Sequence, residues 1–272
     1  MHTPVLLQQV IENLDIQTNG LYIDATLGEG GYTREIIEHG GKVLAIDADI
    51  NQISNFTSLK NIQLVHGNFA DIETIAKNNH FYPVDGIAFD LGLSMEQLNT
   101  SKRGFSYKKL MEPLDMRLDV ENEVTAGEFI NYSTQQELYE LFARNSEEIN
   151  SQAIAEAIVA KRKIRKLQTV GDLMQVLNKV TGEPNAQVNK RIFQALRIAV
   201  NEEFVNLSKG LEGSLKLIKD EGKIIVVTFH SLEDRIVKRF IKTHGCHELK
   251  KSIKGRRDVS YERSATLRVF SK

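Results

Sequence analysis

The chain has 272 residues, of which 41% are hydrophobic and 26% charged, which is the composition of an ordinary soluble globular protein with one large domain or one domain plus a smaller one. Its formal net charge of −1 excludes a protein that holds nucleic acid by overall charge, so any such contact has to come from local basic patches. A single cysteine, Cys246, excludes an internal disulfide and fits a reducing, cytoplasmic location, and no apolar run approaches the roughly 18 residues of a membrane span.

A short amphipathic segment, residues 3–14, leads into residues 21–49, LYIDATLGEGGYTREIIEHGGKVLAIDAD. We interpret these as an apolar strand, a glycine-rich turn, a helix, and a second apolar strand that ends in Asp47. Glycine lets the backbone turn sharply and lets a ligand come close to it. Asp47 stands 19 residues after Gly28, near the ~20 at which an acidic residue accepts the hydroxyls of a ribose. We therefore expect a ribose-bearing ligand at the carboxyl ends of parallel strands.

The sequence of the turn alone does not decide which ligand it binds. Gly28 and Gly30 match the dinucleotide fingerprint G-x-G-x-x-G, but Thr33 takes the place of the third glycine. The missing glycine weakens the case for a nicotinamide cofactor, which carries a pyrophosphate. S-adenosylmethionine has a ribose and no pyrophosphate, so it needs the acidic residue and not the third glycine. A glycine turn that binds no ligand is the remaining alternative.

The predicted strands recur at a spacing typical of an α/β protein. They begin near residues 21, 43, 62 and 86, and each interval is long enough for one crossover helix. This predicts a doubly wound, Rossmann-like, mostly parallel sheet. The next strand, residues 224–229, begins 138 residues after Gly86, where a crossover needs only about 30. The surplus predicts an inserted helical domain.

We place the inserted domain at residues 106–186 and expect it to recognise the substrate. Capping boxes at Thr125 and Thr134 predict helix starts within it. A long helix over residues 188–204 is assigned back to the main domain. The tail, residues 246–253 and 265–270, predicts a closing pair of strands, which is typical of S-adenosylmethionine-dependent methyltransferases and unusual in dehydrogenases. Residues 1–105 and 187–272 are therefore predicted to form a methyltransferase domain.

The fourth strand ends in DGIAFDLGLS, which places Asp90 at the carboxyl edge beside the glycine turn. A carboxylate there can hold the ammonium group of the methionine part of the cofactor. Asp90 to Ser94 also occupy the position at which amino-methyltransferases carry an Asp/Asn-Pro-Pro-Tyr motif, which accepts hydrogen bonds from an exocyclic NH2 group. We expect Asp90 and Ser94 to be catalytic. The alternative is a strand-end helix cap, worth about 1 kcal/mol.

A polar loop follows at residues 102–119, KRGFSYKKLMEPLDMRLD. This segment holds four charged residues, Arg103, Asp115, Arg117 and Asp119, and such a loop can bind a polar substrate. The equal alternative is a salt-bridged loop that packs the insertion down. Because no third ligand stands at a useful spacing from the two aspartates, we expect no metal site.

Taken together, these residues resemble the bacterial 16S ribosomal RNA (cytosine-N4)-methyltransferases nearly from end to end. The matching blocks are HTPVLLQQV, YIDATLGEGG, AIDAD, VDGIAFDLGLS with EQL, RGFSY, PLDMRLD, FQALRIAVNEE and TFHSLEDRIVKRF. The resemblance implies S-adenosylmethionine as methyl donor and, as acceptor, a cytidine in the decoding region of the small ribosomal subunit. The cofactor contacts that it implies are Gly30, Gly31, Tyr32, Asp47, Phe69, Asp90 and Gln97.

Some positions depart from the family pattern. Tyr32 stands where the family usually has His, Met95 replaces a Ser, and residues 147–153, EEINSQA, lack most of the usual arginine-rich block. Arg197, Asn201 and His230 are further candidates near the acceptor. For His230, the alternative is a hydrogen-bonded histidine at a helix start.

Three other functions stay open at this point: a methyltransferase acting on DNA or protein, a nicotinamide-dependent oxidoreductase, and an RNA-binding module without catalysis. The expected partner is 16S rRNA in the small ribosomal subunit. The basic runs at residues 161–166 and 250–257 are either RNA contacts or solvated faces. We expect no membrane contact, and the oligomeric state stays open, with a homodimer among the arrangements.

Overall fold

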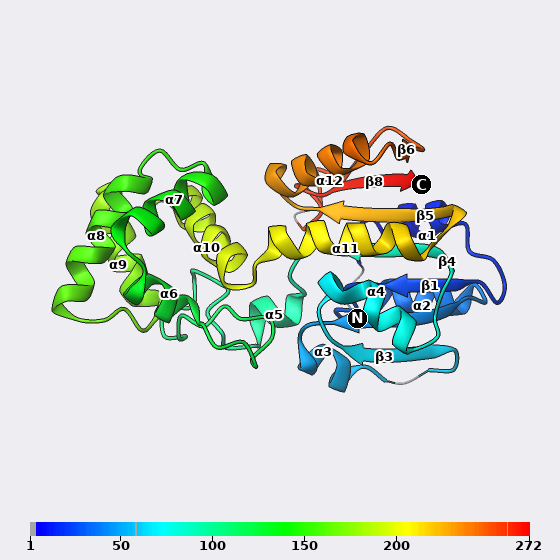
Figure 1. Cartoon of the computed structure of the whole chain (residues 1–272). Helices are drawn as coiled ribbons and strands as arrows, with labels where there is room; N and C mark the ends of the chain where they lie inside the picture. Colours follow the sequence, from blue (N-terminus) through cyan, green and yellow to red (C-terminus); the bar gives the residue numbers. More distant parts are fainter. Residues whose placement is uncertain (1–3, 58, 260) are drawn as a thin grey trace. The chain divides into compact units, whose positions relative to one another are not determined.

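The structure is a computed structural model that describes residues 4–57, 59–259 and 261–272 (Figure 1). The chain divides into two units, one made of Met1–Ser94 with Phe204–Lys272 and the other of Met95–Glu203. We call the first the sheet unit and the second the helical unit. Within the described ranges, no helix combines the length and the apolar character that a membrane span needs.

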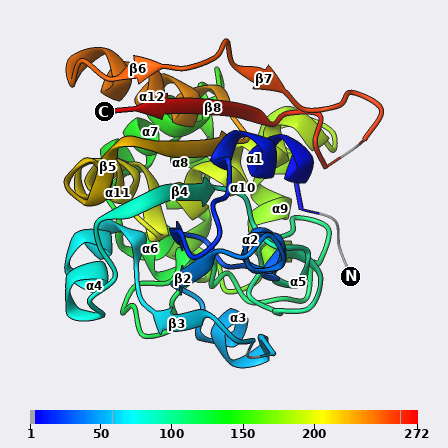
Figure 2. The same cartoon turned by 90° about the vertical axis from the view of Figure 1, so that its right-hand side faces the viewer.

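The sheet unit is built on one mixed sheet with the strand order β3-β2-β1-β4-β5-β8-β6, and β7 also pairs with β8 (Figure 2). The first five strands of this order run parallel, and β8 is antiparallel to β5. The strands are β1 (Leu21–Asp24), β2 (Lys42–Asp47), β3 (Ile62–His66), β4 (Val84–Asp90), β5 (Ile218–Thr228), β6 (His247–Glu248), β7 (Ile253–Lys254) and β8 (Thr266–Ser271). The predicted doubly wound α/β fold is confirmed, including the antiparallel closing strands of the tail.

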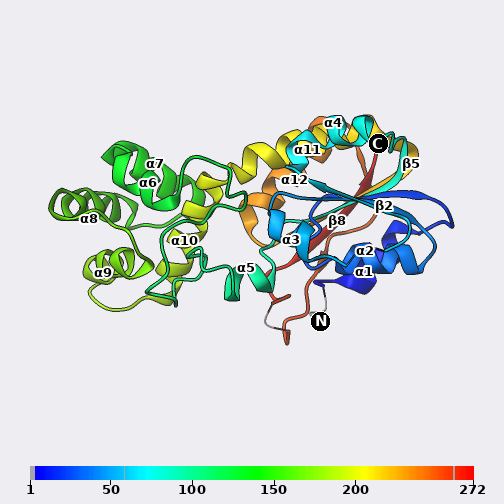
Figure 3. The same ribbon diagram turned by 90° about the horizontal axis from the view of Figure 1, so that it is seen from below.

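Helices cover both faces of this sheet (Figure 3). Ile23 and Ile87 point to a core shared with α4 and α11, whereas Tyr22 and Val43 point to a core shared with α1 and α2. Alternate strand residues thus serve opposite faces, as the period of two requires. The helices are α1 (Leu7–Leu14), α2 (Gly31–Glu38), α3 (Ile50–Asn55), the short 3-10 helix η1 (Phe69–Asp71), α4 (Ile72–Asn78), α11 (Glu203–Leu217) and α12 (Ser231–Thr243).

The helical unit contains six helices among its residues, all of which the structure describes. They are α5 (Met95–Asn99), α6 (Ala126–Tyr132), α7 (Gln135–Ser146), α8 (Ser151–Ile164), α9 (Val170–Thr181) and α10 (Ala186–Val200). The predicted capping boxes at Thr125 and Thr134 are both formed. Fully buried Leu138, Phe142 and Ile158 contribute to the apolar interior of this unit.

The boundaries of the units differ from the predicted ones. Helix α10 packs against α6, α7 and α9, so residues 187–203 belong to the helical unit and not to the methyltransferase domain, and residues 95–105 join them. The helix that covers the sheet is α11, whose Leu207 and Leu211 lie in the sheet core. Glu202, with φ of 48°, separates α10 from α11. The functional roles assigned to the two domains stay predictions.

Candidate functional site

The turn between β1 and α2 forms the centre of the candidate site. Gly28 and Gly30 both adopt positive φ, 49° and 76°, which glycine reaches without strain. A Cβ at Gly30 would lie 2.0 Å from the ring of Phe56, so close packing of the protein requires that glycine. A Cβ at Gly28 would meet no described atom nearer than 3.9 Å. A methyl group at Gly28 would therefore be in ordinary van der Waals contact with its neighbours and would clash with none of them. Gly31 begins α2 directly after the turn.

Asp47 at the end of β2 is held against this turn. Its Oδ2 accepts a hydrogen bond from the Gly28 amide at 2.8 Å, and its Oδ1 accepts one from the Asp49 amide at 2.8 Å. Burial raises the pKa of Asp47 to about 6. Among the residues that the structure describes, no basic side chain forms an ion pair with it. Each carboxylate oxygen keeps capacity for a second hydrogen bond, which fits a ribose diol.

Asp90 at the end of β4 is tied to the same turn. Its amide donates to Thr26 Oγ1 at 2.7 Å. Its Oδ1 is buried and has no hydrogen-bond partner among the described residues. Burial, reinforced by the charge of Asp24, raises the pKa of Asp90 to about 7. A buried acceptor without a donor is costly, so this atom fits a ligand group that is cationic and donates hydrogen bonds.

Asp24 is a carboxylate beside this turn for which we predicted no role. It ends β1, is fully buried, and accepts from Thr33 Oγ1 at 2.7 Å and from the Thr26 amide at 3.3 Å. Burial raises the pKa of Asp24 to about 6. The signal in the sequence was a carboxylate that closes an otherwise apolar strand.

The remaining predicted cofactor and catalytic residues divide between the two units. Tyr32 is buried, and its hydroxyl donates to the Val5 carbonyl, which ties the N-terminal segment to α2. Phe69 packs edge-on to Phe89, with ring centroids 5.6 Å apart. Ser94 is the last residue of its segment of the sheet unit, whereas Gln97 is a buried residue of α5 in the helical unit. Their cofactor contacts stay predictions.

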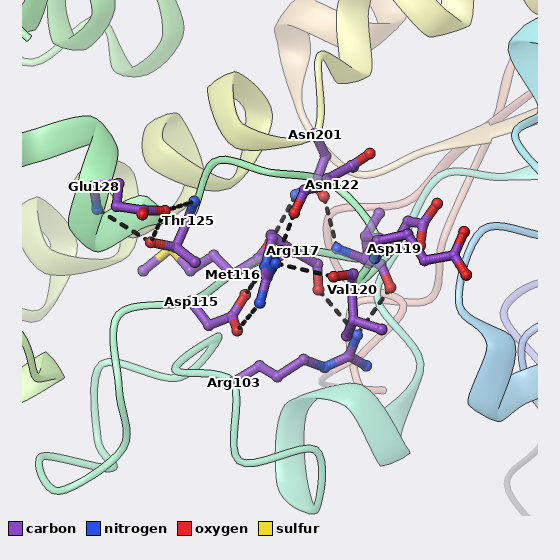
Figure 4. Close-up of polar contacts among 12 residues, drawn as sticks. Arg103, Asp115, Met116, Arg117, Asp119, Val120, Asn122, Thr125, Glu128 and Asn201 are labelled. Atoms are coloured by element: carbon purple, nitrogen blue, oxygen red, sulfur yellow. Dashed lines mark hydrogen bonds and ion pairs between the residues drawn. The ribbon is translucent and has the colours of Figure 1, made fainter.

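The polar loop of the helical unit is internally bonded (Figure 4). Arg117 forms two hydrogen bonds with the Asp115 carboxylate, at 2.8 and 2.9 Å, and these outweigh burial and hold the pKa of Asp115 below its usual range. Arg103 donates to the carbonyls of Arg117 and Leu118, both at 2.9 Å. These contacts agree with the second of our two interpretations, a salt-bridged loop. Binding of the substrate by this loop stays a prediction.

Asn201 fastens this loop to the end of α10 (Figure 4). Its Nδ2 donates to the Met116 carbonyl at 2.8 Å, and its Oδ1 accepts from the Leu118 amide at 2.7 Å. Nearby in sequence, Arg197 pairs with Glu203 through two hydrogen bonds, at 2.7 and 2.9 Å. The structure thus gives Asn201 and Arg197 positions within the framework of the helical unit.

His230 caps the start of α12. Its Nδ1 accepts from the Glu233 amide at 3.4 Å, and its Nε2 lies 2.8 Å from Glu233 Oε1. This is the helix-start contact that we gave as the alternative for His230, and a place near the acceptor stays a prediction. No group of three or more His, Cys, Asp or Glu side chains in the described ranges is arranged to hold a metal ion.

Comparison with known proteins gives similarity along the whole chain. The model of a family described as the MraW methylase family matches residues 1–272. Three similar relatives each bear the name Ribosomal RNA small subunit methyltransferase H. The relative from Thermomicrobium roseum is 42% identical over 89% of this chain and 77% of its own length. The relative from Clostridium botulinum (strain Loch Maree / Type A3) is 39% identical over 87% of this chain and 80% of its own length. The one from Coprothermobacter proteolyticus is 37% identical over 100% of this chain and 96% of its own length.

Proposed function

Because the chain belongs to the MraW methylase family, with S-adenosylmethionine as its cofactor, we propose that it methylates the exocyclic N4 of a cytidine in the decoding region of 16S rRNA. The acceptor molecule is the rRNA of the small ribosomal subunit. The name shared by the relatives supports an rRNA acceptor, and the amino-methyltransferase position of Asp90 to Ser94 supports an exocyclic amine.

The observation that carries the proposal is the length of the similarity. The Coprothermobacter proteolyticus relative matches 100% of this chain and 96% of its own length, so the similarity includes both the sheet unit and the helical unit. A match confined to the sheet would support a methyl donor and say nothing of the acceptor. Here the unit that would meet the acceptor is matched as well.

In the proposed site, two carboxylates of the sheet unit hold the cofactor. When bound, S-adenosylmethionine supplies an electrophilic methyl group on a positively charged sulfur. Asp47 accepts the ribose hydroxyls with the lone pairs that its bonds to Gly28 and Asp49 leave free. Asp90 holds the methionyl ammonium with its unpartnered Oδ1. Gly28, which has no side chain, lets the cofactor come close to the backbone of the turn.

Catalysis by this chain would depend on positioning. The lone pair of the cytosine amino group is delocalised into the ring, so the amine is a poor nucleophile. Acceptors that pyramidalise the amine and align it for in-line attack on the methyl group raise the rate. We assign this role to Ser94 and to the carboxylate oxygen of Asp90 that does not hold the ammonium. No strong base is needed before attack, because the proton is lost late. The acceptor base has to leave its stack to reach them.

We assign recognition of the rRNA to the helical unit. The basic run at residues 161–166 lies at the end of α8, and its Lys163, Arg165 and Lys166 are exposed. Lys166 also lies 4.6 Å from the ring centroid of the exposed Tyr132. Exposed cations with an aromatic side chain provide phosphate contacts and a stacking surface for unpaired RNA.

The test is methyl transfer with the product identified. The purified chain is incubated with labelled S-adenosylmethionine and with small subunits that lack the modification, and the RNA is then digested to nucleosides. We expect label in N4-methylcytidine, and loss of transfer by Asp90→Ala. Label in another nucleoside, in ribosomal protein, or in DNA offered in parallel would contradict the proposed acceptor.

A further inference from the structure

Asp24 is a buried charge that the proposed mechanism leaves without a role. Its side chain is fully buried, and the donors that it receives are the neutral hydroxyl of Thr33 and the neutral amide of Thr26. In the ranges that the structure describes, no Lys, Arg or His forms an ion pair with it. Burying a carboxylate without a cation is costly, and a neutral side chain of similar shape would fasten the same turn at lower cost.

The position of Asp24 connects it to the cofactor site. Thr26 lies in the glycine turn, and its Oγ1 accepts from the amide of Asp90. Thr33 lies in the first turn of α2, on the far side of the glycines. Asp24 therefore fastens both ends of the turn that Asp47 and Asp90 also contact. Strands β1 and β4 pair in parallel, so Asp24 and Asp90 stand at the carboxyl ends of neighbouring strands, and the charge of Asp24 contributes to the raised pKa of Asp90.

Three carboxylates thus surround one turn, and none of the three has a basic partner among the described residues. Asp47 and Asp90 have proposed ligand groups, the ribose and the methionyl ammonium. These two groups are identical in the donor, S-adenosylmethionine, and in the product, S-adenosylhomocysteine. The two ligands differ in the sulfur, which is a cationic sulfonium in the donor and a neutral thioether in the product. A further negative charge favours the ligand with the further positive charge.

We propose that Asp24 is a specificity-determining residue, whose buried charge shifts the preference of the cofactor site from the thioether product toward the sulfonium donor. The inference rests on the cofactor and is independent of the acceptor. Asp24 touches neither reacting group and acts through its field. If Asp24 only held the turn in place, its loss would weaken the binding of donor and product equally, because both ligands bind beside the same turn.

Calorimetric titration of the full chain separates these two roles. The ligands are S-adenosylmethionine, S-adenosylhomocysteine and sinefungin, in which an ammonium group takes the place of the sulfonium methyl. The variants are Asp24→Asn, which keeps an acceptor for Thr33, and Asp24→Ser, a smaller neutral side chain in case the first does not fold. Asp85→Asn is the matched control, because Asp85 lies at the opposite end of β4, bonded to Leu21 and Lys219.

We expect the ratio of the product Kd to the donor Kd to fall about tenfold in the Asp24 variants, the order of effect of one unit charge acting across protein interior. The Asp24 variants should bind sinefungin more weakly, as they do the donor. The Asp85 variant should keep the wild-type ratio of the two Kd values. An unchanged ratio in a folded Asp24 variant, with donor and product weakened equally, would overturn the inference. Failure of methyl transfer to RNA would contradict the acceptor and leave this ratio measurable.

Discussion

Asp90→Asn is predicted to stabilise the unliganded protein at alkaline pH while it removes stabilisation by S-adenosylmethionine. Asp90 carries a buried Oδ1 without a partner, next to the charge of Asp24. An asparagine resembles the protonated, neutral form of the carboxyl group. The substitution therefore removes a charge whose burial opposes folding, and it also removes the acceptor that we assign to the methionyl ammonium.

The magnitude follows from the raised pKa of Asp90. Burial lifts it from 3.8 to about 7, and each unit corresponds to about 1.4 kcal/mol. Because the folded pKa exceeds the unfolded one, wild-type stability contributed by this group falls as pH rises through that interval. The cost is about 2 kcal/mol at pH 5 and reaches its upper limit, about 4 kcal/mol, above pH 7.

Urea unfolding of both proteins at pH 5 and pH 8, with and without S-adenosylmethionine, measures this. The free energy of unfolding of the variant should exceed that of wild type by more at pH 8 than at pH 5. A cofactor concentration of 100 times Kd should stabilise wild type by ~2.7 kcal/mol and the variant by far less. Asp85→Asn, on the same strand, loses an ion pair with Lys219 and should be no more stable than wild type at either pH. A variant less stable than wild type at pH 8, or one stabilised equally by the cofactor, would refute the reasoning.

Three further predictions concern the turn, the loop and the pH dependence of binding. Gly28→Ala places a side chain at a φ of 49°, so thermal unfolding should show a loss of about 1 kcal/mol, and protection by S-adenosylmethionine should largely disappear; full protection would argue against cofactor binding beside Gly28. Asn201→Ala leaves the Met116 carbonyl and the Leu118 amide unpaired and should cost about 2 kcal/mol in chemical unfolding. Asn201→Asp should cost at least as much, because its second carboxylate oxygen would face the Met116 and Arg197 carbonyls in place of the Nδ2 donor. Because the pKa of Asp90 is about 7 and the ammonium requires the ionised form, calorimetric Kd for S-adenosylmethionine should rise about tenfold from pH 8 to pH 6; a flat profile would exclude Asp90 as the ammonium ligand.

Local sequence patterns were sufficient to predict the sheet. Strands β1, β2 and β4 are short, mostly apolar runs that end in an aspartate, and such runs predict strands without knowledge of their neighbours. Asp47 and Asp90 were predictable for the same reason, because a carboxylate that closes a parallel strand lies at the ligand edge. Asp24 meets the same criterion, yet its role depends on which donors reach it. Only the three-dimensional structure shows that these are Thr26 and Thr33.

The domain boundary and the loop contacts could not be predicted from the sequence. The periodicity of residues 188–204 identifies an amphipathic helix and says nothing of which unit covers its apolar face. For that reason α10 was assigned to the sheet, although it packs with α6, α7 and α9. The same limit applies to Asn201, whose partners Met116 and Leu118 are more than 80 residues away along the chain.

The most direct measurement is the nucleoside content of the decoding region in small subunits from cells that lack this gene. We predict that one N4-methylated cytidine is missing, that it returns when the wild-type chain is supplied, and that the Asp90→Ala variant does not restore it. An unchanged set of methylated nucleosides, or restoration by that variant, would contradict the central claim.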